Sequence, residues 1–358
     1  MRSSRLLRLA ALLAATALAA AACGGDSGGE AKAAGPDCDP NAPTLTVSFA
    51  AYSTPREVYG KIIPAFQAQW KEDHDDQQVI FQESYGGSTT QSQNVVNGYP
   101  ADIVALSLAP DVDAIADAGL ITHDWTTAPD GGMVSSSVVV LDVRPGNPEG
   151  LADFDDLTQD GLEVLTPDPA ASGGARWNIV AAYGAAMRGY AGNQKDDEAG
   201  AQALLAGIFK NVTVLDKSAR DSIKNFESGN GDVAITYENE VFTAQDAGLE
   251  DEMVIPPSTV LIENPVAVVD KNAEEHCVKE VADAFVDYLH TPEVKDLYTT
   301  VGFLRSTDAA EAQKGGGDFE PIEDLFTVDD FGGWDSLNDT VFGDPDGVFT
   351  KAFAEAQG

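Results

Sequence analysis

The sequence predicts an α/β fold, because short apolar strand-like runs alternate with helix-like segments from residue 44 onward. Between two of these runs, residues 89–97 have a helical pattern, and Gly98 is placed to end that helix. Residues 278–289 have the spacing of an amphipathic helix. This alternation favours mostly parallel sheets, and we find no internal repeat. The strand-like runs are residues 44–49, 79–81, 103–106, 138–143, 163–166, 212–215, 233–236 and 266–269.

The N-terminus has the pattern of an export signal. Its first residues carry positive charge, at Arg2, Arg5 and Arg8. An apolar run follows over residues 6–22 and is shorter than the roughly 20 residues of a membrane-spanning helix. The small residues before Cys23 resemble a bacterial lipobox, although Ala20 stands where that motif usually has leucine. We therefore expect a signal peptide over residues 1–22 and a lipid on Cys23 that anchors the protein to the outer face of the cell membrane. The alternative is an ordinary signal peptide with another cleavage site.

Residues 23–43 are rich in Gly, Ala, Asp and Pro and show no periodic apolar pattern. A segment of this composition buries too little surface to fold by itself, so we interpret it as a flexible tether. The roughly 315 residues that follow are enough for one large domain or two medium domains with proper cores.

The chain has three cysteines. If Cys23 is lipidated, Cys38 and Cys277 remain as a pair in an oxidising compartment, which predicts a disulfide between them. Such a bond would close a loop of about 240 residues, worth roughly 5 kcal/mol if it acts by restricting the unfolded chain. Two free thiols are the alternative.

The charge excludes several partners. Asp and Glu number 59 against 21 Lys and Arg, which gives a net charge of −38. A chain this acidic does not bind nucleic acid or an anionic lipid surface through charge, so the membrane contact would be the lipid anchor only. The same charge repels small anions, so any anion site must act at short range through hydrogen-bond donors.

Three turns each place a small hydroxyl residue before a predicted helix: residues 84–88, 172–178 and 216–220. Ligands of α/β sheets bind at the carboxyl ends of strands, next to helix N-termini. A helix N-terminus offers unpaired N–H groups and about half a positive charge, so it holds an anion without a cationic side chain. Each turn is also compatible with an ordinary cap, such as Ser88 at the start of the 89–97 helix.

Residues 172–178, SGGARWN, resemble the signature of bacterial sulfate-binding proteins. Four other segments are similar to that family as well: residues 85–88, 214–220, 237–240 and 331–334. The resemblance covers roughly residues 44–345. It implies a two-lobed type II periplasmic-binding-protein fold with the ligand in the interlobe cleft. The expected lobes are residues 44–134 with 259–358, and residues 135–258.

The resemblance also implies how the anion is held, namely by neutral donors. Carried over by position, these donors are the hydroxyls of Ser88 and Ser172 and the backbone N–H groups of Gly173, Gly174 and Ala219. Ser53 is a looser match for a further backbone donor, because two extra residues lie nearby. Tyr237 stands where the family has a tryptophan, and a phenol also donates. Three arginines adjoin these loops, either to offset charge through the backbone or to pair with carboxylates: Arg56, Arg176 and Arg220.

The expected ligand is sulfate or thiosulfate. We expect a monomeric binding protein, without cofactor or metal, that passes this anion to the permease of an ABC transporter and, through the permease, acts with its ATPase. No Gly-x4-Gly-Lys-Ser/Thr loop occurs in the sequence, so ATP hydrolysis would belong to that partner. Donors alone suit sulfate, because the proton of hydrogen phosphate would lack an acceptor, at a cost of about 1–3 kcal/mol. Molybdate and phosphate remain alternatives. A serine hydrolase using Ser172 is another, but the serine lacks a Gly-x-Ser-x-Gly motif and the chain has only four histidines.

Overall fold

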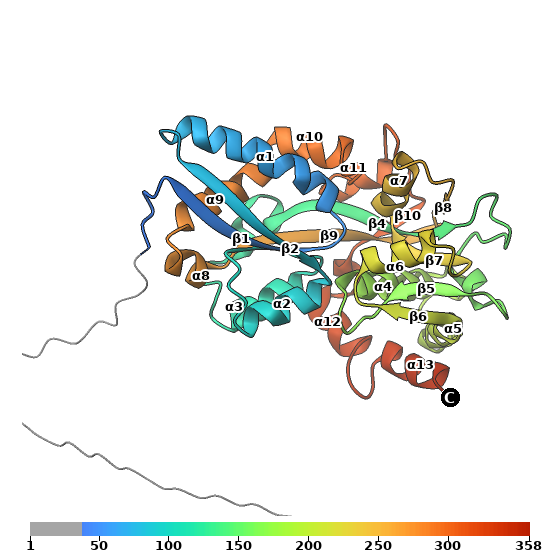
Figure 1. Ribbon diagram of the computed structural model, residues 1–358. Helices are drawn as coiled ribbons and strands as arrows, with labels where there is room; N and C mark the ends of the chain where they lie inside the picture. Colours follow the sequence, from blue (N-terminus) through green and yellow to red (C-terminus); the bar gives the residue numbers. More distant parts are fainter. Residues whose placement is uncertain (1–37) are drawn as a thin grey trace, which may run out of the picture. The chain divides into compact units, whose positions relative to one another are not determined.

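The computed structural model describes residues 38–358. The predicted signal peptide and Cys23 lie outside the described residues. The described chain contains a ten-stranded sheet with helices on its faces, in the strand order β2-β1-β3-β9-β4-β7-β5-β6, with β10 beside β9 and β8 beside β4 (Figure 1). None of the helices in residues 38–358 has the length and apolarity that a membrane span requires.

One end of the sheet consists of parallel strands β1 (Thr44–Tyr52), β2 (Gln78–Gly86) and β3 (Ile103–Ala105). Three helices connect them to each other and to the rest of the sheet: α1 (Arg56–Asp73), α2 (Ser88–Val96) and α3 (Ala109–Asp117). The core here includes Phe49 and Phe66, which pack against Phe285 at ring-centroid distances of 5.8 and 5.0 Å.

Two long antiparallel strands, β4 (Met133–Val143) and β9 (Ser258–Val268), cross the middle of the sheet. β9 pairs with β3 at its end, whereas the second half of β4 pairs with β7 (Val233–Tyr237) and β8 (Glu252–Val254). Every residue of β4 after Met133 is buried. These two strands therefore connect the two parallel ends of the sheet.

The other end of the sheet is again parallel, with β5 (Val164–Pro167) between β6 (Val212–Asp216) and β7. The helices at this end are α4 (Gly173–Arg188), α5 (Glu198–Lys210), α6 (Ala219–Glu227) and α7 (Glu238–Asp246). α4 is buried along most of its length, which explains its lack of a polar face.

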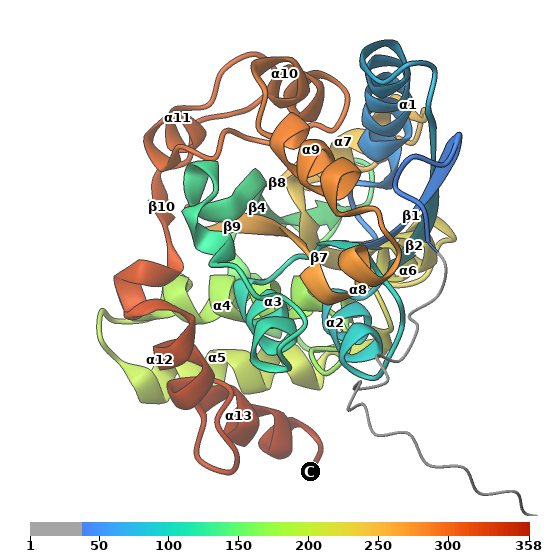
Figure 2. The same ribbon diagram turned by 90° about the vertical axis from the view of Figure 1, so that its left-hand side faces the viewer.

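After β9, the C-terminal part of the chain consists mostly of helices. Its elements are α8 (Asp270–Glu275), α9 (Lys279–Leu289), α10 (Pro292–Thr300), α11 (Ala309–Lys314), β10 (Asp324–Phe326), α12 (Gly333–Thr340) and α13 (Val348–Ala356). α13 packs on α5 (Figure 2), and the rings of Phe349 and Phe209 lie 4.9 Å apart at this contact. Four short 3-10 helices complete the described chain: η1 (Trp125–Thr127), η2 (Pro129–Gly132), η3 (Phe154–Thr158) and η4 (Val328–Phe331).

The α/β prediction is confirmed, with three differences. Parallel pairing holds at both ends of the sheet, but the middle is antiparallel. The predicted cap of the 89–97 helix is wrong: α2 already includes Ser88, and Gly87 is its N-cap. The helix expected over residues 278–289 begins one residue later, at Lys279.

Residues 38–43, the last part of the expected tether, contact the folded body. Cys38 is bonded to Cys277, with their Cα atoms 5.6 Å apart. The carbonyl of Pro43 accepts from the N–H of Gln78 at 2.9 Å. The predicted disulfide is therefore present, and it fixes the chain just before β1.

Candidate anion-binding site

The three turns predicted to bind an anion meet at one small cavity, with about 180 Å³ of atom-free space. Its lining consists of Tyr52, Ser53, Thr54, Gly86, Gly87, Ser88, Ser107, Ser172, Gly174, Ala219 and Tyr237. Every one of these side chains is uncharged. All the proposed donors are in this lining except Gly173, which lies beside it as the first residue of α4.

Helices α2, α4 and α6 all begin at this cavity. Ser172 is the N-cap residue of α4, yet its hydroxyl makes no capping hydrogen bond. By contrast, the Ser218 hydroxyl caps α6 and accepts from the N–H of Asp221 at 3.2 Å. The buried Ser172 hydroxyl is therefore available to a ligand, and three positive helix ends face the same space.

Glycine is required at two points of close approach. A Cβ at Gly87 would lie 2.4 Å from the carbonyl oxygen of Ala171 and 2.6 Å from that of Lys217. A Cβ at Gly173 would lie 2.8 Å from Ser107 Oγ. Any larger residue at Gly87 would separate the start of α2 from the turns before α4 and α6, and the cavity would open.

Ser88 is held in a buried hydrogen-bond chain. Its hydroxyl donates to Asp111 Oδ2 at 2.6 Å and accepts from the N–H of Ser107 at 2.9 Å. Burial raises the pKa of Asp111 to about 6, against the hydrogen bonds from Ser88 and Thr89 and the charge of Arg176. No sequence pattern pointed to Asp111, which precedes no glycine turn and lies on α3.

Tyr237 ends β7 and is fully buried. Its hydroxyl lies 2.7 Å from Ser107 Oγ, so either oxygen can donate to the other. Burial raises the pKa of Tyr237, which keeps the phenol neutral. Ser107 was also missed, although its place just after strand β3 is where ligand-binding residues of α/β sheets lie.

The three neighbouring arginines have different partners. Arg220 forms ion pairs with Glu57 at 2.7 Å and with Glu240 at 2.8 Å, and it also donates to the carbonyl of Thr54. The guanidinium of Arg176 lies over a phenylalanine ring, and that of Arg56 lies 5.0 Å from the centre of the Tyr85 ring. Arg220 therefore pairs with carboxylates, one of the two roles left open by the sequence, and also contacts the backbone.

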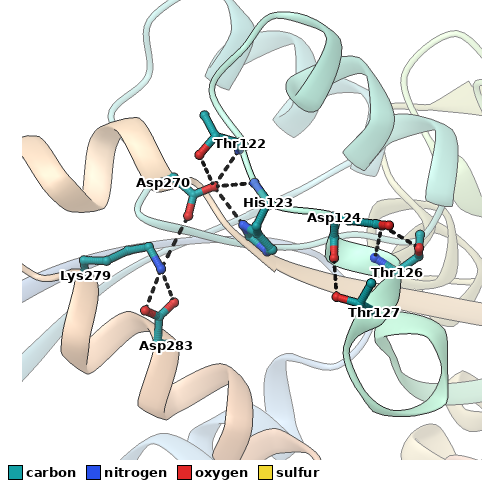
Figure 3. Close-up of polar contacts among 8 residues, drawn as sticks. All are labelled: Thr122, His123, Asp124, Thr126, Thr127, Asp270, Lys279 and Asp283. Carbon is teal, nitrogen blue, oxygen red and sulfur yellow. Dashed lines mark hydrogen bonds and ion pairs between the residues drawn. The ribbon is translucent and has the colours of Figure 1, made fainter.

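No histidine lines the cavity in residues 38–358. His123 pairs with Asp270 at 2.7 Å, and Asp270 also accepts from Thr122 and lies 3.4 Å from Lys279 (Figure 3). His276 pairs with the buried Asp102 at 2.6 Å. These contacts join the loop after α3 to the start of α8, and the end of α8 to the residue before β3.

The fold, with a small uncharged cavity at three helix N-termini, is that of a type II periplasmic binding protein. A family model described as bacterial extracellular solute-binding protein matches residues 47–304. The chain belongs to this family, which places it outside the cytoplasm.

Similar proteins with narrower descriptions are known. The chain is 38% identical to a sulfate-binding protein from Synechococcus elongatus, over 94% of this chain and 93% of that protein. It is 36% identical to a thiosulfate-binding protein from Pseudomonas aeruginosa, over 87% of this chain and 92% of that protein. The solved structure of the sulfate-binding protein SubI from Mycobacterium tuberculosis matches with a TM-score of 0.73 and 34% identity, covering 82% of this chain and 98% of that one.

Proposed function

We propose that this protein captures sulfate outside the cytoplasm and delivers it to an ABC importer, with thiosulfate as the related candidate. The observation that carries the proposal is a small cavity at three helix N-termini that is lined only by uncharged groups. The similarity to sulfate- and thiosulfate-binding proteins over most of the chain supports the same ligand class.

Neutral donors fit a fully ionised oxyanion. Sulfate presents only acceptor oxygens, so each donor from Ser172, Gly173, Gly174 or Ala219 would find a partner. Hydrogen phosphate would bring a proton that needs an acceptor, and an unpaired buried donor costs about 1–3 kcal/mol. The low local dielectric of a closed cavity strengthens each hydrogen bond to the anion.

The proposed lobes are residues 44–134 with 259–358, and residues 135–258. The turn before α2 comes from the first lobe, and the turns before α4 and α6 come from the second. Hydrogen bonds between these parts support closure over a ligand; for example, the N–H of Thr90 donates to Ala171 at 3.1 Å, and Arg220 donates to Thr54 at 3.0 Å.

Calorimetry of the purified mature protein with sulfate, thiosulfate, molybdate and phosphate tests the ligand. We expect sulfate or thiosulfate to bind at neutral pH, with phosphate weaker by at least the tenfold that about 1.4 kcal/mol represents. Equal affinities for sulfate and phosphate would refute the donor argument. Ester or peptide hydrolysis that is lost in Ser172→Ala would favour the hydrolase alternative instead.

Anchoring through Cys23 is a separate proposal, based on the lipobox-like run before it. Cys23→Ser should move the exported protein from the membrane fraction to the soluble fraction. If the variant stays with the membranes, the anchor lies elsewhere.

A further inference from the structure

A second, larger pocket adjoins the anion cavity. We call it the vestibule and define it by its charged residues Arg56, Glu57, Lys217, Arg220, Asp221 and Lys224. It has about 1080 Å³ of atom-free space and shares three lining residues with the cavity, Ser53, Gly86 and Gly87. An ion in the vestibule therefore lies next to the proposed site.

The vestibule has the opposite charge to the rest of the protein. Its lining holds four cationic side chains and two carboxylates, in a chain whose net charge is −38. One carboxylate, Glu57, is bound by Arg220 at 2.7 Å, and the other, Asp221, accepts from the Ser218 hydroxyl at 2.8 Å.

Three of the cations have no acidic partner. Within residues 38–358, Arg56, Lys217 and Lys224 form none of the ion pairs shorter than 4.0 Å, although carboxylates outnumber cations almost threefold. All three are exposed. Arg56 comes from the start of α1, whereas Lys217 precedes α6 and Lys224 lies within it, so the cations come from both proposed lobes.

The positive charge of the vestibule offsets the repulsion that the net negative charge of the protein exerts on an anion. An acidic surface repels a dianion at distances up to the Debye length, about 8–10 Å in physiological salt. A concave pocket with a local positive excess reverses the field where the ion must pass and raises the association rate, by about 10- to 1000-fold in known cases. Lys217 lies directly before the N-terminal end of α6, so the charge of the lysine and the positive end of the helix dipole both attract an anion.

We propose that the vestibule is a capture subsite for small oxyanions, in which Arg56, Lys217 and Lys224 hold the anion briefly before it enters the neutral cavity. The vestibule provides the long-range attraction, and the cavity provides selectivity. The inference rests on the proposed oxyanion-binding function and adds a kinetic role for residues that do not belong to the cavity lining.

Stopped-flow binding of sulfate tests the proposal, with tryptophan fluorescence as the signal. Trp177 is a suitable reporter because its indole N–H donates to the carbonyl of Ser107 at the cavity. The test variant is Lys217→Gln with Lys224→Gln. The matched control is Lys195→Gln with Lys271→Gln, which removes the same charge from exposed lysines outside the vestibule.

At low ionic strength the vestibule variant should bind sulfate about 3- to 10-fold more slowly than the control, with an almost unchanged dissociation rate. The difference should shrink as salt is raised. Equal association rates in the two double variants would overturn the capture subsite while leaving the binding function intact. A parent protein that binds no oxyanion in calorimetry would overturn both proposals.

Discussion

The Ser88 hydroxyl has a single proton, and Asp111 and an anion in the cavity compete for it. In the structure this proton points to Asp111, 2.6 Å away, while the Ser88 oxygen accepts from Ser107. A protonated Asp111 could donate to the second lone pair of Ser88 and release the serine proton to the anion. The charged or titratable groups that act on Asp111 are Arg176 on α4 and the neutral Tyr237, whereas α2 contributes only hydroxyls.

We therefore expect anion affinity to rise as the pH falls through about 6, the raised pKa of Asp111. Above this pH the affinity should fall by up to about tenfold per unit, because Asp111 must first take up a proton. Asp111→Asn should bind tightly at pH 8 with a flat pH profile, since the amide always donates. Asp113→Asn on the same helix is the control, because Asp113 accepts from Trp125 and does not contact Ser88. Calorimetry from pH 5 to 8 measures both, and identical slopes in the parent and Asp111→Asn would contradict this coupling.

Ser172 and Ser218 allow a second comparison at the residue scale, because both are N-cap residues but only Ser218 caps its helix. Ser172→Ala should lower sulfate affinity by about 10- to 150-fold, the effect of losing one charge-assisted hydrogen bond of about 1.5–3 kcal/mol. Its melting temperature should hardly change. Ser218→Ala should do the reverse and lose about 1 kcal/mol of stability. Thermal melts and calorimetry on the two variants decide the matter, and a destabilised Ser172→Ala with normal affinity would remove Ser172 from the site.

At the scale of elements, Asp270 joins three segments of the fold (Figure 3). It begins α8 after β9, accepts from the backbone N–H of Thr122 at 2.6 Å, and lies 3.4 Å from Lys279 on α9. Burial acts to raise the pKa of Asp270, but the N–H of Thr122 and the side chain of His123 outweigh it and hold the pKa at about 2. The carboxylate is thus stabilised in its charged form.

A lowered carboxylate pKa contributes stability above the unfolded-state value near 4, and this contribution is lost as the pH falls through about 2. The shift corresponds to about 2 kcal/mol. Asp270→Asn should lower the free energy of unfolding by about this amount at pH 7 and lessen the loss between pH 4 and 2. Asp283→Asn, which removes the more exposed carboxylate paired with Lys279, should cost under about 1 kcal/mol. Urea unfolding across this pH range provides the measurement, and equal costs for the two variants at pH 7 would disprove the assignment.

At the scale of the whole molecule, the Cys38–Cys277 bond and the anion cavity lie at opposite ends of β1. The bond precedes Thr44, whereas Tyr52 at the other end lines the cavity. Nine strand residues separate them by roughly 30 Å. Stability and ligand affinity should therefore respond differently to the loss of the bond.

Replacing both cysteines, Cys38→Ser with Cys277→Ser, should reduce the free energy of unfolding by up to roughly 5 kcal/mol, because the open loop gains entropy in the unfolded chain. Sulfate affinity should stay within about twofold. Denaturant unfolding and calorimetry of the double variant are the two measurements, with the reduced parent protein as a second comparison. A large loss of affinity in a folded double variant would show that the bond also positions β1 at the cavity.

The sequence by itself determined the local features of this protein. The alternation of apolar runs predicted most of the strands at both ends of the sheet and a few of the helices, because period and length depend on neighbouring residues only. The SGGARWN run and the two serine-bearing turns indicated an anion site, and the cysteine count indicated the disulfide. The apolar runs and the turns are short-range signals, and the cysteine count depends only on composition, so none of them requires knowledge of how the segments meet.

The tertiary structure decided the rest. β4 and β9 pair antiparallel through residues more than a hundred positions apart, and no local pattern encodes that register. Ser107 and Asp111 join the site only because β3 and α3 place them beside the start of α2. Gly87 is needed for backbones that approach from two distant turns, and the vestibule gathers cations from α1 and from the segment around α6. Hydrogen bonds and charge act between groups that packing brings together, and this packing is determined by the burial of the whole core, which no single segment contains.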